Sequence, residues 1–576
     1  QLNFKIMKIR TFTSLILAGM LSLNSCVNNG DIDELQDQIN DLNSTVETLQ
    51  KTQQEALLAA IASLTADLVS LENELGSDID DLGTDYNALL VDLGILENEV
   101  EGNAKAVFYG NVITEADYTA LTAQGATIIT GRVVIGGDAH VAALANVKLI
   151  GKNLEINGGA TISLPALQSV GEDLLVSGLN TSATINLAKL ASVGGDVEIR
   201  NNAGLTSVMA NELVLISGRL SSEVNEALTA LSFSKLDQVN EIYVNEYVEG
   251  NWDNPQGVLA ILDVSATNVN GNVFVSYVGD VDTLSFGNVN GNFVVTYSKI
   301  VNISISGMTL AGDFKLDYNT RLKTVATPNL KRIEGLLNIA GNLDYNAPGS
   351  SLTDLPAFSA LKYIGGTVTI SSNGDLVTAD SFNSVTEVAG DRIDFSGNGK
   401  FESINIFNAL TDTYSQYQDA HLFLSAQTNW FNGFSEVSKL NEISITIQVP
   451  AEGDGGFGIS SAAASAVTGV AKMEGFGKLT SSTNLQLYIS EVTEFNAFGS
   501  YTGFLRSYGT GLVIQMPAAE VGMCSMEPFL AKVNTGDIDS QPMKLQETTI
   551  NEWGWPESVD VDKDIAVDRL LAPCGV

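Results

Sequence analysis

One spacing of aliphatic residues recurs through the middle of this chain and limits the folds that the chain can adopt. Three, four and two positions separate successive anchors, first at Val147, Ile150, Leu154 and Ile156. The spacing recurs at four more places and, with one extra residue, at a fifth: Leu167/Val170/Leu174/Val176, Leu190/Val193/Val197/Ile199, Leu330/Ile333/Leu337/Ile339, Leu361/Ile364/Val368/Ile370 and Val385/Val388/Ile393/Phe395. The last two anchors of each set predict a short strand with one buried side, because residues two apart in a strand share a face. Periods of about 20 to 31 residues indicate a solenoid in which each repeat, or rung, covers the next.

Partial repeats and glycines fill the intervals between the full repeats. Only the separations of four and two survive at Val269/Val273/Val275, Val289/Phe293/Val295 and Leu310/Phe314/Leu316. A glycine lies at the entry to the predicted strand in most repeats: Gly151, Gly171, Gly194, Gly271, Gly291, Gly312, Gly335, Gly365 and Gly390. We attribute these glycines to a sharp reversal of the chain, which glycine tolerates because it adopts positive φ freely.

Asparagines follow several of the predicted strands, with a hydrophobic residue three positions later. Examples are Asn202/Leu205, Asn319/Leu322, Asn373/Leu376 and Asn398/Phe401. An asparagine side chain both donates and accepts hydrogen bonds, so it can satisfy backbone groups of a turn that no neighbouring strand reaches. Residues 205–268 follow the spacing poorly and predict an irregular part of the stack, and weaker rungs are expected at Leu422/Leu424, Ile443/Ile445/Ile447, Leu485/Leu487/Ile489 and Leu512/Ile514.

Two segments carry a resemblance to a known family. Leu164-Pro-Ala-Leu-Gln-Ser-Val-Gly171 and Pro328-Asn-Leu-Lys-Arg-Ile333 resemble the leucine-rich-repeat-related solenoid of receptor L domains. The resemblance covers roughly residues 133–404 and implies a mainly β protein built as a right-handed β-solenoid. It is informative about architecture and carries no information about a ligand. We therefore expect a β-solenoid over residues 105–520 and a C-terminal cap over residues 521–576.

The N-terminal residues have the organisation of a secretory signal. A basic segment, Met7–Arg10, precedes an apolar run, Leu15–Leu23, that is too short to span a bilayer. The following Asn-Ser-Cys resembles the lipobox of Bacteroidota surface lipoproteins, which implies a signal peptide over residues 1–25 and a lipid on Cys26. The alternative is a plain signal peptide with an incidental cysteine.

The same resemblance implies where the mature chain is located. Acidic residues after Cys26 are similar to the signals that send such lipoproteins to the cell surface, so we expect an outer membrane lipoprotein exposed there. Residues 26–30 would form the lipidated tether. We identify no second apolar run of eighteen residues and therefore expect the lipid to be the only membrane attachment.

Residues 31–104 have the pattern of a long coiled coil. Apolar residues alternate at spacings of three and four, with β-branched residues at one heptad position and leucine at the other: Ile32, Ile39, Val46 and Leu35, Leu42, Leu49. That choice favours two strands and therefore a homo-oligomer joined through this stalk. Gly76 interrupts the pattern, so the alternative is a hairpin within one chain.

Chemical motifs are scarce in this chain. The two histidines, His140 and His421, are far apart, and we find no HExxH, Walker A, GxSxG or paired CxxC pattern. We therefore predict no catalytic residue, metal site or cofactor. Asp560, Asp562 and Asp564 imitate the start of a calcium loop, but Ile565 replaces the glycine that its turn requires, so an acidic turn is expected.

Charge and cysteines restrict the partners and the stability of the chain. The 68 acidic residues outnumber the 29 Lys and Arg, giving a formal charge of −39, which argues against a nucleic-acid partner. Cys524 and Cys574 lie in a chain expected to be secreted, so we predict a disulfide between them. Two buried thiols are the alternative.

Aromatic residues supply the ligand-binding candidates. Tyr277, Tyr297 and Tyr318 each fall two residues after the last anchor of three successive rungs, so stacking should align them. An aligned set offers flat faces for sugar rings, although such tyrosines also pack inside solenoids. Trp430 is a further candidate, whereas Trp553 and Trp555 are expected to be buried in the cap.

These features favour one function class and leave two alternatives. The leading hypothesis is a non-enzymatic cell-surface lipoprotein whose repeats present a binding or adhesion surface for a glycan or a protein. The first alternative is a β-helix carbohydrate-active enzyme, either a glycosidase or a polysaccharide lyase, since such an enzyme needs only two or three carboxylates or basic groups in a cleft. The second alternative is a structural subunit of a surface assembly.

Overall fold

The chain forms two compact units, residues 1–102 and residues 103–576. The computed structural model describes residues 36–38, 40–48, 51–52, 54–71, 75, 106–247, 257–344, 346–398, 400–411, 421–428, 430–438, 442–448, 471–480, 484–490, 492–501, 512–516, 527–535, 543–547, 549–550 and 556–557.

The described part of the first unit is α-helical and exposed to solvent. Leu64, Leu68 and Leu71 lie on the helix surface. The coiled coil and its homo-oligomer therefore stay predictions, as does the hairpin, whose turn at Gly76 lies outside the described residues. Gln54–Leu71 has 18 residues and a mean hydropathy of 1.3, enough to cross a membrane by length and composition alone. A single helix of this kind is weak evidence for a span, so attachment through the lipid alone also stays a prediction.

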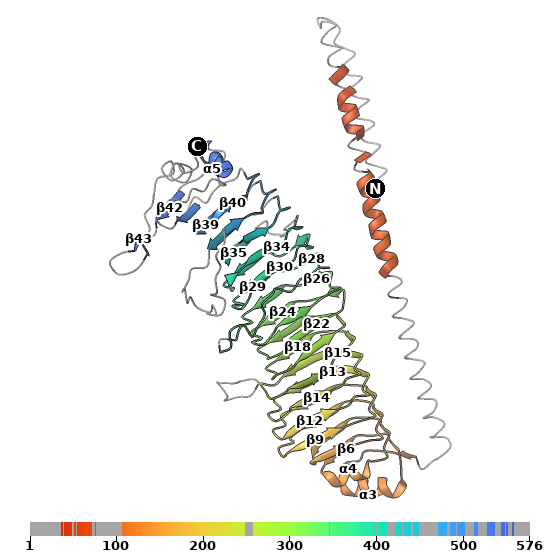
Figure 1. The fold of residues 1–576 in the computed structure, drawn as a ribbon. Helices are drawn as coiled ribbons and strands as arrows, with labels where there is room; N and C mark the ends of the chain where they lie inside the picture. Colours follow the sequence, from red (N-terminus) through yellow and green to blue (C-terminus); the bar gives the residue numbers. More distant parts are fainter. Residues whose placement is uncertain are drawn as a thin grey trace. The chain divides into compact units, whose positions relative to one another are not determined.

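The second unit is mainly β and forms a β-solenoid of about 13 turns, as the repeat spacing predicts. Among the described residues, one parallel sheet of 29 strands runs along the unit, and smaller sheets form another side of the stack (Figure 1). A typical rung gives the main sheet two strands, such as β7 and β8, and gives a side sheet a third, such as β9. The sequence pattern had indicated only one strand per repeat.

The main sheet consists of β1 (Val107–Phe108), β2 (Ile128–Ile129), β3 (Val133–Gly136), β4 (Leu149–Ile150), β5 (Leu154–Gly158), β7 (Ser169–Val170), β8 (Leu174–Ser177), β10 (Ser192–Val193), β11 (Val197–Arg200), β13 (Leu215–Glu223), β15 (Gln238–Asn245), β17 (Asn268–Val269), β18 (Val273–Ser276), β20 (Asn288–Val289), β21 (Phe293–Thr296), β23 (Thr309–Leu310), β24 (Phe314–Asp317), β26 (Arg332–Ile333), β27 (Leu337–Ala340), β28 (Tyr363–Ile364), β29 (Val368–Ser371), β31 (Glu387–Val388), β32 (Arg392–Ser396), β33 (Lys400–Phe401), β35 (His421–Thr428), β37 (Glu442–Gln448), β39 (Asn484–Ser490), β41 (Leu512–Met516) and β42 (Met543–Glu547). The side sheets are β6 (Thr161–Ser163), β9 (Ala183–Asn186), β12 (Leu205–Met209), β14 (Ala230–Ser232) and β16 (Ile261–Asp263); β19 (Thr283–Phe286), β22 (Asn302–Ile305) and β25 (Thr324–Ala326); and β30 (Thr378–Ser381), β34 (Ser403–Ile406), β36 (Trp430–Gly433), β38 (Ala471–Met473) and β40 (Val492–Phe495). The strands β43 (Thr549–Ile550) and β44 (Pro556–Glu557) form an antiparallel pair.

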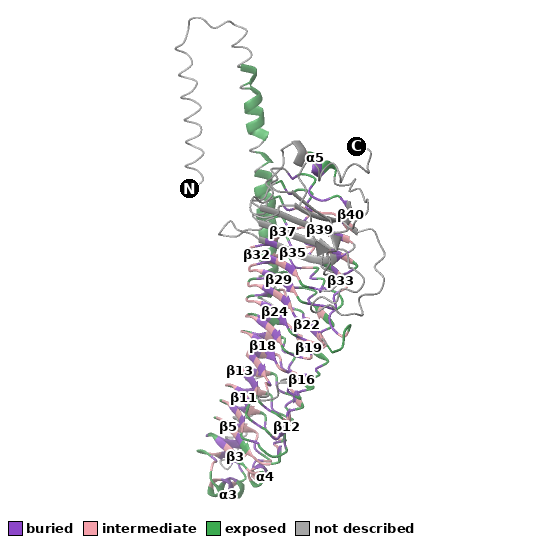
Figure 2. Cartoon of the chain, turned by 90° about the vertical axis from the view of Figure 1, so that its left-hand side faces the viewer, coloured by how far each residue is buried: buried purple, intermediate pink, exposed green. Residues whose placement is uncertain are grey.

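The predicted anchors form one continuous core inside the stack. Equivalent anchors pair across rungs, as Leu154 does with Leu174 and Leu174 with Val197. All anchors of the full repeats are buried in a single hydrophobic cluster. Buried positions, drawn in purple, recur along the strands of the solenoid in Figure 2. The weaker rungs are strands of the same sheet, β35, β37, β39 and β41, and β42 continues it beyond residue 520. The anchor prediction is therefore confirmed.

The stack continues through the part of residues 205–268 that the structure describes, and the predicted irregularity takes the form of register shifts, one of them between Leu205 and Ser207. The strands β13 and β15 pair in parallel with each other and with their neighbours, with one register shift between Ile216 and Arg219. Leu213, Ile216, Leu220 and Ser222 keep the separations of three, four and two. The last of these anchors is a serine, so a search for aliphatic residues missed this rung.

The glycines at the strand entries serve a different purpose from the one expected. None of the nine has a positive φ, so the prediction of a sharp reversal was wrong. Each lies against the backbone of the preceding rung instead: a Cβ on Gly171 would lie 2.3 Å from the carbonyl oxygen of Gly151. A Cβ on Gly194 would lie 2.2 Å from that of Gly171. Glycine is required here because the backbones of successive rungs approach too closely for a side chain.

We expect Gly171→Ala to lower the free energy of unfolding by about 1–3 kcal/mol, because the new methyl group meets backbone that cannot move aside. Chemical denaturation followed by circular dichroism measures the change. The control is Gly137→Ala, where a Cβ would have no atom within 4 Å. Equal midpoints for the two variants would contradict the close-approach explanation.

Two helices cover the N-terminal end of the solenoid. They are α3 (Glu115–Gln124) and α4 (Asp138–Ala143), and neither was expected from the sequence. The ring of His140 stacks on Tyr118 at 4.0 Å, and its Nε2 lies 2.8 Å from Glu115 Oε1. His140 is therefore part of this cap. Near the other end, α5 (Glu527–Thr535) adds Phe529 and Leu530 to the core.

Candidate functional site

The predicted tyrosines lie side by side in the turns that follow β18, β21 and β24. The rings of Tyr277 and Tyr297 are 5.2 Å apart and 4° from parallel, and those of Tyr297 and Tyr318 are 4.8 Å and 12° apart. Tyr247, which follows β15, extends this set at 5.0 Å with its ring turned by 70°. We call these four residues the tyrosine row. Tyr247 was missed from the sequence because its rung lies in the region that looked irregular.

The tyrosine row is partly exposed to solvent, but the ring faces that were expected to be free are covered. The side chains of Tyr297 and Tyr318 remain 41% and 50% exposed, so they do not pack inside the solenoid. Their ring faces, however, lie against one another. At the end of the row, a Cβ on Gly341 would lie only 2.7 Å from two ring atoms of Tyr318. The expectation of free flat faces for sugar stacking was therefore wrong, and the row presents ring edges and hydroxyls.

The backbone of the tyrosine row is strained. Tyr277, Tyr297 and Tyr318 have φ of 54°, 48° and 53°, in the left-handed region that a bulky residue rarely adopts. Some rungs place glycine at the same position, as at Gly178, Gly341 and Gly397, and others place a smaller residue with positive φ there, namely Asn201, Val224 and Ser372. Glycine adopts this conformation without strain. The three tyrosines thus occupy a position where a residue without a side chain would be more stable.

A second aromatic row shows how such strain is normally compensated. In the part of the solenoid from residue 358 onward that the structure describes, six phenylalanines with positive φ stack in sequence: Phe358, Phe382, Phe407, Phe434, Phe476 and Phe498. All six are at most 2% exposed. The sequence did contain a signal for this phenylalanine row, since each member lies three residues before a hydrophobic residue, as Phe382 does before Val385. Burial of the side chains offsets the backbone strain in the phenylalanine row. In the tyrosine row, whose side chains are partly exposed, burial offsets much less of that strain.

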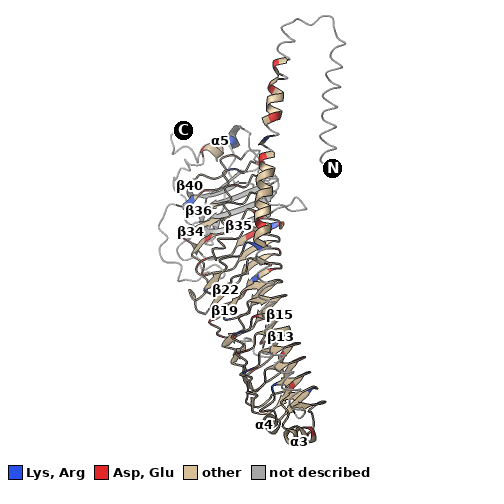
Figure 3. Ribbon diagram, turned by 90° about the vertical axis from the view of Figure 1, so that its right-hand side faces the viewer, with Lys and Arg blue, Asp and Glu red and all other residues tan. Residues whose placement is uncertain are grey.

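Aromatic and charged side chains flank the tyrosine row on the outer face of the main sheet. Tyr243 stacks on Phe274 at 4.9 Å, and the guanidinium of Arg219 lies 4.3 Å from the centre of the Tyr243 ring. At the other end, Lys315 Nζ lies 2.9 Å from Asp317 Oδ2. Burial raises the pKa of Asp317, and the neighbouring Lys315 opposes that shift. In the view of Figure 3 the charges of the solenoid are scattered among uncharged residues.

The predicted role of the asparagines is confirmed. Asn202, Asn319, Asn373 and Asn398 are buried, and Asn225 and Asn342 extend the set. Each amide donates to a strand carbonyl, as Asn373 Nδ2 does to Ile339 O at 2.9 Å. The Oδ1 atoms of all except Asn225 accept a backbone N–H of the preceding rung, as Asn373 Oδ1 does from Asn342 N at 3.2 Å, whereas Asn225 Oδ1 accepts from Asn202 Nδ2 at 2.9 Å. We call this set the asparagine ladder.

A carboxylate takes one place in the asparagine ladder. Glu246, immediately before Tyr247, is buried and accepts from Asn225 N at 2.7 Å and Asn225 Nδ2 at 3.0 Å. Ser222 Oγ donates to the same carboxyl group. Burial raises the pKa of Glu246, the nearby Glu223 adds to the shift, and the three hydrogen bonds oppose it. Sequence reasoning missed Glu246 because the ladder was expected to hold only asparagine.

We expect Glu246→Gln to make the stability of the protein less dependent on pH. A carboxyl group with a raised pKa binds its proton more tightly in the folded state, so the free energy of unfolding falls as pH rises from the ordinary value near 4.5 through the raised pKa. Glutamine removes the charge and keeps one acceptor oxygen for Asn225, while its amide nitrogen, a donor, replaces the other carboxyl oxygen. Melting temperatures between about pH 5 and about pH 8 should therefore decline less in the variant. Glu226→Gln, at an exposed position, is the control, and an unchanged pH profile for Glu246→Gln would contradict the assignment.

Trp430 lies apart from the tyrosine row. It belongs to β36 of a side sheet, is half-buried, and donates from Nε1 to Glu474 Oε2 at 2.8 Å. The structure therefore does not bring the fourth predicted binding residue into the same site. Cys26, Cys524, Cys574, the Asp560–Asp564 turn, Trp553 and Trp555 lie outside the described residues, and so does the side chain of His421.

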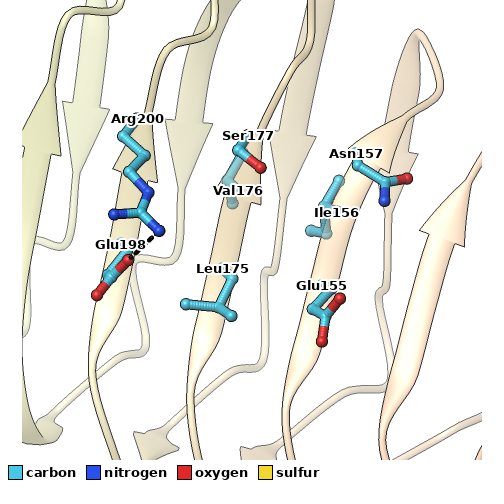
Figure 4. A pocket seen from close by; sticks show the side chains of 8 residues that line it. All are labelled: Glu155, Ile156, Asn157, Leu175, Val176, Ser177, Glu198 and Arg200. Atoms are coloured by element: carbon cyan, nitrogen blue, oxygen red, sulfur yellow. Dashed lines mark ion pairs between the residues drawn. The ribbon is translucent and has the colours of Figure 1, made fainter.

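A shallow hollow lies on the outer face of β5, β8 and β11. Its volume is about 100 Å³, and Leu175 lies between Glu155 on one side and Glu198 on the other (Figure 4). Each carboxylate is engaged by an arginine, Arg132 at 3.0 Å and Arg200 at 3.3 Å. Two ion-paired carboxylates in an open hollow lack the free acid and base that glycoside hydrolysis needs. Within the part of the chain that the structure describes, no group of three or more His, Cys, Asp or Glu could hold a metal ion.

No protein-family model and no curated protein sequence matches this chain. Function must therefore be argued from the site itself.

Proposed function

We propose that this protein is a non-enzymatic binding protein whose tyrosine row contacts the ligand. One observation carries the proposal: Tyr297 and Tyr318 are held in a strained conformation while 41% and 50% exposed. Backbone strain that packing does not compensate is concentrated at functional sites. The buried phenylalanine row serves as the internal comparison, because there the same conformation has an evident structural reason.

The chemistry of the tyrosine row suits recognition. Tyrosine offers a rigid, amphipathic contact surface with little side-chain entropy to lose, and it is enriched at binding interfaces. Stacking between neighbouring rings restricts their motion before any ligand arrives. The solenoid then acts as a scaffold that holds the four rings at fixed intervals.

We propose further that the solenoid is right-handed, related to leucine-rich repeats, and displayed at the outer membrane surface by a lipid on Cys26 and a coiled-coil stalk. The lipobox-like ending at Cys26 and the heptad pattern support this proposal. A role as a carbohydrate-active enzyme or as a structural subunit stays an alternative hypothesis, and the hollow between Glu155 and Glu198 offers the first of these no support.

The proposal is tested by replacing Tyr297 and Tyr318 together with glycine. Because glycine tolerates positive φ, the double variant should keep or increase its stability while it loses at least about tenfold in affinity, or 1.4 kcal/mol. The full chain is screened against glycans and extracellular matrix proteins, and every ligand found is titrated with both forms. Tyr109→Gly, at a tyrosine that is 79% exposed but outside the row, is the control. Undiminished binding by the double variant, or failure of the wild-type chain to bind any probe, would overturn the proposal.

A further inference from the structure

We infer that the ligand of the tyrosine row is a linear, uncharged glycan with equatorially linked pyranose rings, which lies along the solenoid axis with about one sugar per tyrosine. This inference rests on the proposed function, since it names the ligand class of the same site.

The interval between the rings points to a polymer with a matching repeat. Successive centroids are separated by 5.0, 5.2 and 4.8 Å, because each tyrosine follows a strand of one parallel sheet. An extended peptide advances about 3.3 Å per residue, so its side chains on one face recur at about 6.6 Å and fall out of step within two rings. Equatorial linkages extend a pyranose chain by close to one strand spacing per sugar, so such a chain stays in step.

The exposed atoms of the row suit sugar hydroxyls approached edge-on. The edges of aromatic rings carry partial positive charge and attract sugar oxygens, whereas the negative faces are stacked against one another. Burial raises the pKa of Tyr277, with contributions from its neighbours Tyr297 and Tyr247, so its hydroxyl is protonated at neutral pH. A protonated phenol both donates and accepts a hydrogen bond, as a sugar hydroxyl does.

The charges around the row favour a neutral glycan over an acidic one. Arg219 lies 3.8 Å from Glu241, Lys315 lies 2.9 Å from Asp317, and Arg321 lies 2.7 Å from Asp280. These three cations are engaged by carboxylates of the same surface. An acidic polymer would have to displace those partners and would meet a chain whose net charge is −39.

The ends of the row set the length of the ligand that it recognises. Gly341 takes the next position after Tyr318 and has no side chain, while the ring of Tyr247 is turned across the other end by 70°. Four rings are therefore available. Affinity should rise with each sugar added up to about four and change little beyond that number, because further sugars pass the last ring.

The test is isothermal titration calorimetry of the full chain with oligosaccharides of two to six sugars. The probes are β-1,4-linked oligomers of glucose, mannose and N-acetylglucosamine, and α-1,4-linked glucose oligomers of the same lengths serve as the axially linked control. We expect at least one β-linked series to gain affinity up to about four sugars, and the α-linked series to bind at least tenfold more weakly. We also expect Tyr318→Gly to shorten the length at which affinity levels off.

Two results would overturn the inference: no binding by any β-linked series, or equal binding by the α-linked series. If a different ligand is found whose binding is lost in the Tyr297/Tyr318 double glycine variant, the proposed function survives and only the ligand class is wrong. If the double variant binds every ligand as tightly as the wild-type chain, the proposed function and the ligand class both fall.

Discussion

Replacing Phe382 with alanine should lower the free energy of unfolding by about 3–5 kcal/mol. The Phe382 side chain is fully buried and stacks on Phe358 and on Phe407, each at 4.9 Å. Alanine leaves a cavity between those two rings and breaks the stack in its middle. Alanine does not relieve the backbone strain either, because φ at this position is 58° and alanine is also strained there.

The matched control for Phe382→Ala is Tyr318→Ala, which truncates an aromatic residue with almost the same φ at a half-exposed site. We expect Tyr318→Ala to change stability by no more than about 0.5 kcal/mol. Guanidinium denaturation gives both values, and hydrogen exchange of β30 and β34 locates the loss in Phe382→Ala. Similar losses in the two variants would contradict the distinction between a packing row and a binding row.

Replacing Asn342 with alanine should cost about 3 kcal/mol or more, since each buried polar group left without a partner costs about 1–3 kcal/mol. Asn342 Oδ1 accepts from Asn319 N at 3.0 Å, and its Nδ2 donates to Leu316 O at 2.9 Å and to Asn373 Oδ1 at 3.0 Å. Alanine offers none of these atoms. Water does not reach the site, because Asn342 is fully buried.

The control for Asn342→Ala is Asn329→Ala, at an exposed asparagine that makes one hydrogen bond, to Ser306 O at 3.1 Å. The loss of stability in Asn329→Ala should stay within about 0.5 kcal/mol, because water replaces the hydrogen bond of the exposed side chain. Thermal unfolding and urea denaturation compare the two variants. If both lose equally little, the asparagine ladder is not needed to satisfy the buried turns.

Two residues, Tyr297 and Glu246, show which features of the site composition and spacing can predict. Tyr297 could be placed in an aligned set from its distance to the last anchor, because the strand spacing is the same at every rung. The exposure of its side chain and the stacking of its ring faces could not be predicted from the sequence, since both depend on the neighbouring turns. Glu246 was hidden for a similar reason: its place in the asparagine ladder becomes evident only when β13 and β15 are stacked in register.

The sequence by itself determined the stacked β architecture, the buried anchors and the function of the asparagines. Those features repeat along the chain, and a local periodicity expresses them because each rung covers the next. Only the tertiary structure shows why glycine occupies the strand entries, which aromatic row is buried and which tyrosine rings remain exposed to solvent. Such features arise from distances between backbones of successive rungs, as at Gly171 and Gly151, and no local pattern encodes a distance between segments that are some twenty residues apart.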